Sequence, residues 1–261
     1  MKPRLRALPF AFFLFAGTAA AEQRHMTATG TSFGVASPCA RQVTIDPDPT
    51  LSGQVTIDAT ADNPQELAQL AFSGSGDAAK LRGPTDRCWR PDENIRFEPT
   101  LTIHVRVPPN FAVAIDESGS GDYRLGTIGA LAVDFSGSGR LQAAAITTLS
   151  VDMSGSGQLS AARVDGAVHA EISGSGAIDI AGGTLPALDL DISGSGGFRL
   201  GAGSIGKMNV DTSGSGKVQI GGTVGDAKLQ LSGSGSVDIA KLTGSMSQEV
   251  EGSGTVRIGS R

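Results

Sequence analysis

The sequence predicts an all-β protein: a single-stranded parallel β-helix (solenoid) of 18–20-residue coils with Ser-Gly-Ser-Gly corners. Three observations support this. The tetrapeptide Ser-Gly-Ser-Gly occurs eight times, and from Ser118 onward it recurs every 18 to 20 residues, a period typical of stacked repeats. Apolar and polar residues alternate on both sides of each tetrapeptide, as they do in half-buried strands. Aromatic residues make up only 5% of the chain, which favours a core of aliphatic strand residues.

Residues 1–21 are expected to form a secretory signal peptide. Three basic residues precede a short apolar run at 7–17, and Ala19-Ala20-Ala21 provides a small-residue cleavage site. The alternative is a retained N-terminal anchor, but the run is too short to span a membrane as a helix. We therefore expect an exported protein, in the periplasm or at the cell surface, without a membrane span after cleavage.

The mature chain is expected to be acidic. Cleavage removes three of the 21 Lys and Arg and none of the 26 Asp and Glu, so the formal net charge falls from −5 to −8. A nucleic-acid surface would need clustered Lys and Arg, which the sequence does not show. No nucleic-acid partner is therefore expected.

The mature chain is expected to have two parts. Residues 22–40 form a lead segment, and residues 41–261 form the β-helix domain, irregular over 41–111 and regular over 112–258. The tetrapeptides begin at Ser73, Ser118, Ser136, Ser154, Ser173, Ser193, Ser213 and Ser232. At a ninth site Glu251 stands in place of the first serine.

Each regular copy contains two short strands. The positions five, three and one residues before the tetrapeptide are mostly apolar, as in Leu131, Val133 and Phe135, and a second alternating strand follows, as in Leu141 and Ala143. A hairpin would pair these two strands with each other, whereas a β-helix pairs each strand with its equivalent in the next copy. The near-constant period favours the β-helix, and it is shorter than the roughly 40 residues of a propeller blade. Equivalent residues should then stack about 4.8 Å apart.

The tetrapeptides are interpreted as corners rather than flexible linkers. Glycine adopts positive φ without steric cost and lets neighbouring backbones approach closely, and the serine hydroxyls can bond backbone groups or the serine of the next coil. The first copy departs from the pattern, because Lys80 falls at an expected core position. Residues 78–98 are therefore expected to form an excursion from the coil, held by Cys88.

The tetrapeptides, placed between these two kinds of strand, resemble the head GIN domain family, which consists of auto-transporter adhesin-like bacterial exported proteins. "RQVTIDPDPTLSGQVTIDA" looks like the first strands of that family, "NPQELAQLAF" is similar to its following segment, and "PTLTIHVRVPPNFAVAIDESGSGD" is similar to the lead into its repeats. The resemblance covers about Arg41 to Ile258. It implies a pectin-lyase-like β-helix with no established catalytic set and a role in adhesion or envelope interaction.

The two cysteines, Cys39 and Cys88, are expected to form a disulfide, because an exported chain meets an oxidising compartment. Closing a loop of this length stabilises the fold by about 4 kcal/mol in the chain-entropy account. The alternative is two independent buried thiols. A metal or catalytic role is not expected, because no histidine or second cysteine lies at ligand spacing.

An acidic ladder is expected two residues before each corner, where the side chains should point outward. Its members are Asp116, Asp134, Asp152, Glu171, Asp191 and Asp211, followed by Gln230 and Glu249. Three roles are open: hydrogen bonds from corner N–H groups to the carboxylates, a stripe for divalent cations or a basic partner, and solvated charge. We favour the backbone hydrogen bonds, with weak cation binding at the six carboxylates as an addition.

No catalytic residue and no cofactor is expected. His25 lies in the polar mature N-terminus, and His104 and His169 alternate with apolar neighbours and should point outward, as single surface histidines do. We therefore expect a cell-envelope protein with a binding or structural, adhesion-like role. Its partner would be an envelope or surface glycan or protein, and homo-oligomers are left open. The alternative is a polysaccharide-acting enzyme that uses carboxylate clusters on a β-helix.

Overall fold

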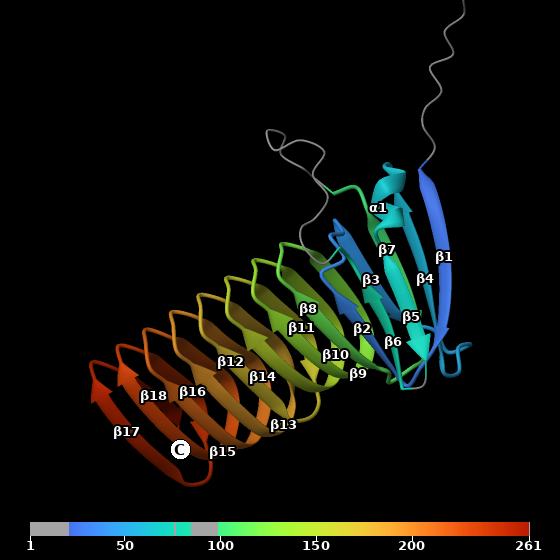
Figure 1. Cartoon of the computed structure of the whole chain (residues 1–261). Coiled ribbons are helices and arrows are strands. Elements are labelled where there is room, and N and C mark those ends of the chain that lie inside the picture. Colours follow the sequence, from blue (N-terminus) through green and yellow to red (C-terminus); the bar gives the residue numbers. More distant parts are fainter. Residues whose placement is uncertain (1–20, 76, 85–98, 261) are drawn as a thin grey trace, which may run out of the picture.

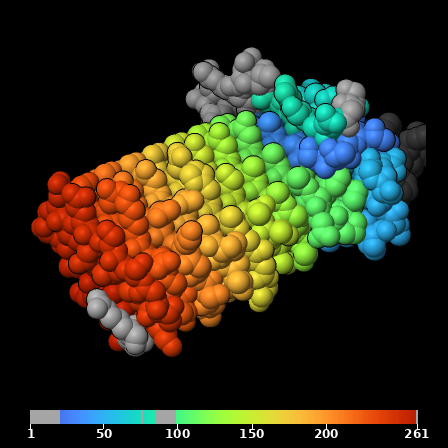
Figure 2. All heavy atoms as spheres, turned by 90° about the horizontal axis from the view of Figure 1, so that it is seen from below, coloured from blue at the N-terminus to red at the C-terminus, as the bar shows by residue number. Residues whose placement is uncertain are grey.

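The computed structural model describes residues 21–75, 77–84 and 99–260. Its strands wind into a parallel β-helix, and from residue 112 onward the coils follow one another in sequence order along a rod (Figures 1 and 2). The predicted fold is confirmed, because equivalent strands of successive copies pair in parallel. Leu141 lies opposite Leu159, 18 residues on, and Ile178 lies opposite Phe198, 20 residues on.

The strands of the regular coils either run from one tetrapeptide to the next, as β9, β10, β13, β14 and β15 do, or cover only part of that distance. They are β8 (Ala112–Glu117), β9 (Asp122–Phe135), β10 (Arg140–Met153), β11 (Gln158–Val164), β12 (Val168–Ile172), β13 (Ala177–Ile192), β14 (Gly197–Thr212), β15 (Lys217–Gly233), β16 (Ser236–Leu242), β17 (Met246–Gly252) and β18 (Thr255–Ser260). β9 and β10, which flank the tetrapeptide at Ser136, pair in parallel along their lengths. The hairpin alternative is therefore wrong.

The N-terminal part adds strands of both directions. They are β1 (Glu22–Thr29), β2 (Ser32–Ala36), β3 (Gln42–Pro47), β4 (Gln54–Ala61), β5 (Ala71–Ser75), β6 (Ala78–Arg82) and β7 (Thr102–Val107), with the helix α1 (Pro64–Ala68) after β4. β2 pairs in parallel with β6 and β8, while β1, β4 and β7 pair antiparallel at this end of the rod (Figure 1). Residues 22–40 thus supply two strands of the sheet. Apart from Ala21, the expected signal peptide lies outside the described residues.

The first tetrapeptide lies in a hairpin and does not join two parallel coils. β5, which contains its first three residues, pairs antiparallel with β6. In β6 Ala79 and Leu81 are buried, whereas Lys80 is exposed. The departure from the pattern noted at Lys80 is a change of register: β6 differs by one residue from the repeat pattern, so every side chain turns to the other face. The chain also stays in the sheet as far as Arg82, so the excursion predicted from Ala78 starts too early.

A buried polar pair lies in the first regular coil. Glu117 occupies the interior column that Phe135 and other apolar residues fill in later coils, and only 4% of it is exposed. Its carboxylate accepts hydrogen bonds from the Gly119 N–H at 2.6 Å and from the Tyr123 hydroxyl at 2.5 Å. The pKa of Tyr123 is raised well above its usual range, chiefly by burial and secondly by the charge of Glu117. Tyr123 therefore stays protonated and donates to the buried carboxylate.

Close approach of neighbouring coils explains the first glycine of the regular tetrapeptides. A Cβ added at Gly155 would lie 2.0 Å from the carbonyl oxygen of Gly137 in the preceding coil, and the Ser156 N–H donates to that same oxygen at 3.0 Å. Among the described tetrapeptide residues, positive φ occurs only at Gly233 and, at the ninth site, Gly252. The expected need for positive φ is therefore confined to the last coils.

Candidate functional site

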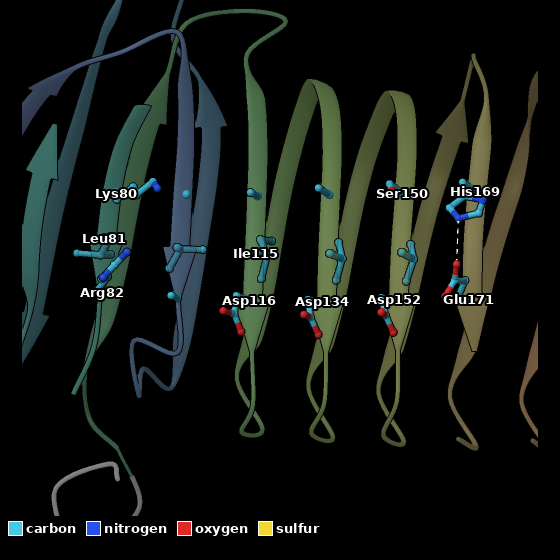
Figure 3. Close-up of a pocket in the computed structure, with 17 residues that line it drawn as sticks. Lys80, Leu81, Arg82, Ile115, Asp116, Asp134, Ser150, Asp152, His169 and Glu171 are labelled. Atoms are coloured by element: carbon cyan, nitrogen blue, oxygen red, sulfur yellow. Dashed lines mark ion pairs between the residues drawn. The ribbon is translucent and has the colours of Figure 1, made fainter. Parts of the chain in front are cut away.

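The acidic ladder has the predicted register. Each of its members lies opposite the next on neighbouring strands, in the order Asp116, Asp134, Asp152, Glu171, Asp191, Asp211, Gln230 and Glu249. All of these side chains are exposed. Figure 3 shows the first four carboxylates in a row across adjacent strands.

The predicted hydrogen bonds from corner N–H groups to the ladder are not formed. Those N–H groups donate to carbonyl oxygens of the preceding coil, as from Ser136 to Glu117 at 3.1 Å and from Ser154 to Phe135 at 2.9 Å. Coil-to-coil pairing thus uses the donors that the carboxylates would need. Within the described ranges, Glu171 alone of the six carboxylates has a side-chain partner, His169, whose Nε2 lies 3.3 Å from its Oε1.

Like charges therefore face one another along the ladder. Asp134 is exposed but still loses part of its contact with solvent, and this desolvation, together with the charges of Asp116 and Asp152 on either side, raises its pKa. Partial desolvation, together with the charges of Asp211 and Glu171 on the adjacent coils, likewise raises the pKa of Asp191. At Asp134 and Asp191 the neighbouring carboxylates thus make ionisation less favourable.

A different outward column pairs opposite charges. Asp179 lies opposite Arg199 with 3.2 Å between Oδ1 and Nη1, and Asp238 lies opposite Arg257 with 3.6 Å between the same atom types. The same fold can therefore stack compensating charges on adjacent coils. The like-charge column is a property of these ladder residues and is not imposed by the β-helix.

A groove of about 500 Å³ lies beside the first part of the ladder, and we call it the ladder-face groove. Its floor consists of small outward-facing residues of β2, β8, β9 and β10, namely Gly34, Ala114, Ala132 and Ser150. An adjoining hollow of about 430 Å³ shares these four residues and extends over Ala112, Ala130 and Thr148. The sheet surface is hollowed here because these side chains reach only a short way out from the backbone.

The two ends and one side of the groove carry polar groups. Lys80 and Arg82 of β6 lie at one end, and His169 and Glu171 of β12 lie at the other (Figure 3). Asp116, Asp134 and Asp152 form one long side. In the part of the chain that the structure describes, no ion pair joins Lys80 or Arg82 to a carboxylate.

Sequence reasoning found the carboxylates of this site but not its cationic end or its floor. Lys80 and Arg82 both fall within the excursion expected over residues 78–98. A signal for the floor is present in the sequence: the outward position four residues before the tetrapeptide is Ala114, Ala132 and Ser150 in the first copies, and His169 in the next.

The remaining predicted site residues lie elsewhere. Cys39 lies between β2 and β3, and Cys88 lies outside the described residues, so the disulfide stays a prediction. The exposed side chains of His25 and His104 face Asp58 and Asp46 at 2.6 and 3.0 Å, on strands that do not line the groove.

Among the described residues, no three His, Cys, Asp or Glu side chains come together as a potential metal site. No helix in the same ranges is long and apolar enough to cross a membrane.

The fold defines the class of this protein as a parallel β-helical repeat protein. Within that class the chain belongs to the family described as "Putative auto-transporter adhesin, head GIN domain", whose model matches residues 109–184 and 184–261. The resemblance seen in the sequence is therefore confirmed. The search of curated proteins found no match.

Several solved structures share the fold. A putative lipid binding protein from Parabacteroides distasonis aligns with a TM-score of 0.67 and 16% identity, over 93% of this chain and 98% of that one. Putative adhesins from Bacteroides fragilis and Parabacteroides merdae both give a TM-score of 0.58, at 13% and 14% identity. These two alignments cover 92% and 93% of this chain, and 97% of each of the other chains. Likeness at such identities demonstrates a common fold.

Proposed function

We propose that this chain is an exported cell-envelope protein that binds an extended partner in the ladder-face groove and does not transform it chemically. The observation that carries the proposal is the course of the groove. It crosses six neighbouring strands, in the order β6, β2, β8, β9, β10 and β12, and so follows the axis of the β-helix. At the usual strand spacing this is a span of about 24 Å.

The construction of the groove suits binding. Its floor residues sit on paired strands rather than on loops, so they need little ordering when a partner arrives, and ordering is one of the main costs of association. The family and the solved relatives carry the names of adhesins and of a lipid binding protein, which describe binding roles. These names support the proposal without identifying the partner.

A polysaccharide-acting enzyme is the second candidate. Asp134 favours it, because a carboxyl group with a raised pKa between two other carboxylates is an arrangement used for acid–base catalysis of glycan cleavage. Incubation of the protein with uronate polymers and other envelope glycans, followed by reducing-end analysis, distinguishes the two. We expect no product, whereas cleavage that Asp134→Asn abolishes would favour the enzyme.

The binding proposal is tested by filling the groove. In Ala132→Arg a long side chain replaces a methyl group at the centre of the floor, and Ala144→Arg is the matched control at an exposed alanine of β10 away from the groove. We expect Ala132→Arg to weaken binding of the mature protein to envelope fractions and arrayed envelope glycans by at least about tenfold, which corresponds to about 1.4 kcal/mol. Biolayer interferometry measures the binding. Equal binding by wild type and both variants would contradict the proposal.

A further inference from the structure

We propose that the occupant of the ladder-face groove is the carboxyl-terminal segment of a basic peptide, with its terminal carboxylate at Lys80 and Arg82. Its basic side chains extend along the carboxylates of Asp116, Asp134 and Asp152. This inference rests on the proposed function and adds the chemistry and the direction of the partner. The argument for it is the distribution of charge around the groove.

The cationic end is suited to a single carboxylate. Lys80 lies opposite Gly34, and Arg82 lies opposite Ala36, so the adjacent strand offers neither of them an acidic partner. A Cβ added at Gly34 would lie 3.7 Å from Cγ of Lys80, which places the lysine stem beside the groove floor. Asp116 is one strand further, about 10 Å from the β6 backbone. A carboxylate seated over Gly34 and Ala36 would therefore meet two cations, and hydrogen bonds between charged groups are the stronger ones.

The long side of the groove is suited to cationic side chains. The carboxylates of Asp116, Asp134 and Asp152 have no side-chain partner within the described ranges and repel one another, as the raised pKa of Asp134 records. A lysine or arginine of the partner placed between two of them would attract both and reduce this repulsion. The ladder spacing of about 4.8 Å lets one such group reach two carboxylates.

The floor and its length suit an extended peptide backbone. A span of about 24 Å accommodates about seven extended residues at 3.3–3.6 Å each. A backbone laid over Gly34, Ala114 and Ala132 would direct alternate side chains to the two sides, because successive side chains of an extended chain point in opposite directions. One set reaches the ladder. The other set lies over the adjoining hollow at Ala112 and Ala130, which has room for small side chains.

A fatty acid is the competing occupant of similar shape. It would place its carboxylate at the same cationic end and its acyl chain on the floor, but it has no group for the ladder. The charge along the side of the groove therefore favours the peptide, and lipid binding becomes an outcome of the test.

The test uses isothermal titration calorimetry on the mature protein with the heptapeptide acetyl-Lys-Ala-Lys-Ala-Lys-Ala-Lys, as the free acid and as the C-terminal amide. We expect the free acid to bind about tenfold more tightly than the amide, because only the acid forms the charged contacts at Lys80 and Arg82. The same peptide with Glu in place of Lys should not bind.

Variants at the two parts of the groove should have different effects. Lys80→Gln combined with Arg82→Gln should remove the difference between acid and amide. Asp134→Asn combined with Asp152→Asn should weaken both peptides by a similar factor. The matched control, Asp179→Asn, removes a carboxylate from the paired outward column and should leave both affinities unchanged.

Each remaining outcome has a defined meaning. Equal binding of acid and amide by wild type would overturn the assignment of Lys80 and Arg82. If neither peptide binds but Ala132→Arg still weakens envelope binding, the peptide inference is overturned and the proposed function stands. If dodecanoate binds, and Ala132→Arg rather than Asp134→Asn abolishes that binding, while the peptides fail to compete with it, the occupant is a lipid and the peptide inference is again overturned.

Discussion

Asp134 lies between Asp116 and Asp152 on the adjacent coils, and the corner N–H groups are already bonded to the neighbouring backbone. The carboxylate therefore keeps its charge at a cost that a partner of opposite charge would relieve. At the scale of the single residue, this unpaired charge distinguishes the ladder from the column of Asp179 and Arg199, where each charge has a counter-charge opposite.

Asp134→Asn should stabilise the free protein at neutral pH by about 0.5 kcal/mol, the usual size of a cross-strand charge effect on an exposed surface. The amide has nearly the same shape and removes repulsion with both neighbours. Thermal and urea unfolding at pH 7 measure the change. Asp179→Asn is the control and should be neutral or slightly destabilising, because it leaves Arg199 without its partner.

The pH dependence of this gain has a defined sign. Because the folded-state pKa of Asp134 is raised above 3.8, the folded protein binds this proton more readily than the unfolded chain does. The cost of the ionised ladder is thus present above the raised pKa and disappears as the pH falls below 3.8. The advantage of Asp134→Asn should shrink over the same window, and an advantage of unchanged size at pH 3 would contradict the electrostatic explanation.

At the scale of the element, the tetrapeptides are determined by contacts between coils. The first glycine faces the backbone of the coil before it, which cannot move aside, as at Gly155 and Gly137. The second glycine mainly faces a side chain: a Cβ at Gly176 would lie 2.0 Å from Sδ of Met153, whose side chain is flexible, and 3.0 Å from the carbonyl oxygen of Gly157. The two glycines of one tetrapeptide should therefore tolerate substitution differently.

Gly155→Ala should destabilise the protein by about 3 kcal/mol, at the upper end for overpacking, because the new methyl group would collide with the carbonyl of Gly137. Gly182→Ala in β13 is the matched control, since its Cβ would meet only the Ala202 carbonyl oxygen at an ordinary 3.5 Å. That change should be neutral or stabilise by about 0.5 kcal/mol through the unfolded chain. Urea unfolding of both variants measures the difference, and equal stability of the two would contradict close coil contact.

At the scale of the whole molecule, the N-terminal part completes the groove that the regular coils begin. β2 lies beside β8 and β6 lies beside β2, so residues such as Gly34 and Lys80 join a surface that the repeats continue. The chain between β6 and β7 contains Cys88, and Cys39 lies between β2 and β3. A disulfide between the two cysteines would tie that chain to the start of the domain.

We expect this disulfide to stabilise the exported protein by about 4 kcal/mol, because it closes a long loop of the unfolded chain. When the mature protein is denatured without reductant, a thiol reagent should label neither cysteine. The double variant Cys39→Ser/Cys88→Ser should have a free energy of unfolding lower by the same amount. Reduced wild type provides the control and should match the double variant. Labelling of two thiols per unreduced chain would contradict the prediction.

The sequence by itself determined the regular coils and the ladder. The period is nearly constant, and every copy alternates apolar and polar residues in the same way. Parallel pairing of equivalent strands therefore brings equivalent positions together, so the repeat period alone predicts the cross-strand neighbours of Asp134 and Asp152. The same repeated pattern indicates the aliphatic core, and its tetrapeptides carry part of the resemblance to the head GIN domain family.

Only the tertiary structure decided the groove. The register of β6 depends on an antiparallel hairpin with β5 and on pairing with β2, about 45 residues away. These two pairings do not recur along the chain, so no repeat in the sequence predicts them. A change of register by one residue moves Lys80 from a position where the repeat pattern expects a core residue to the surface, because successive strand residues face opposite sides. Residues far apart in the chain, such as Gly34 and Ala132, become one floor only when non-local strands pair, and alternation within a single strand carries no information about which strand will lie beside it.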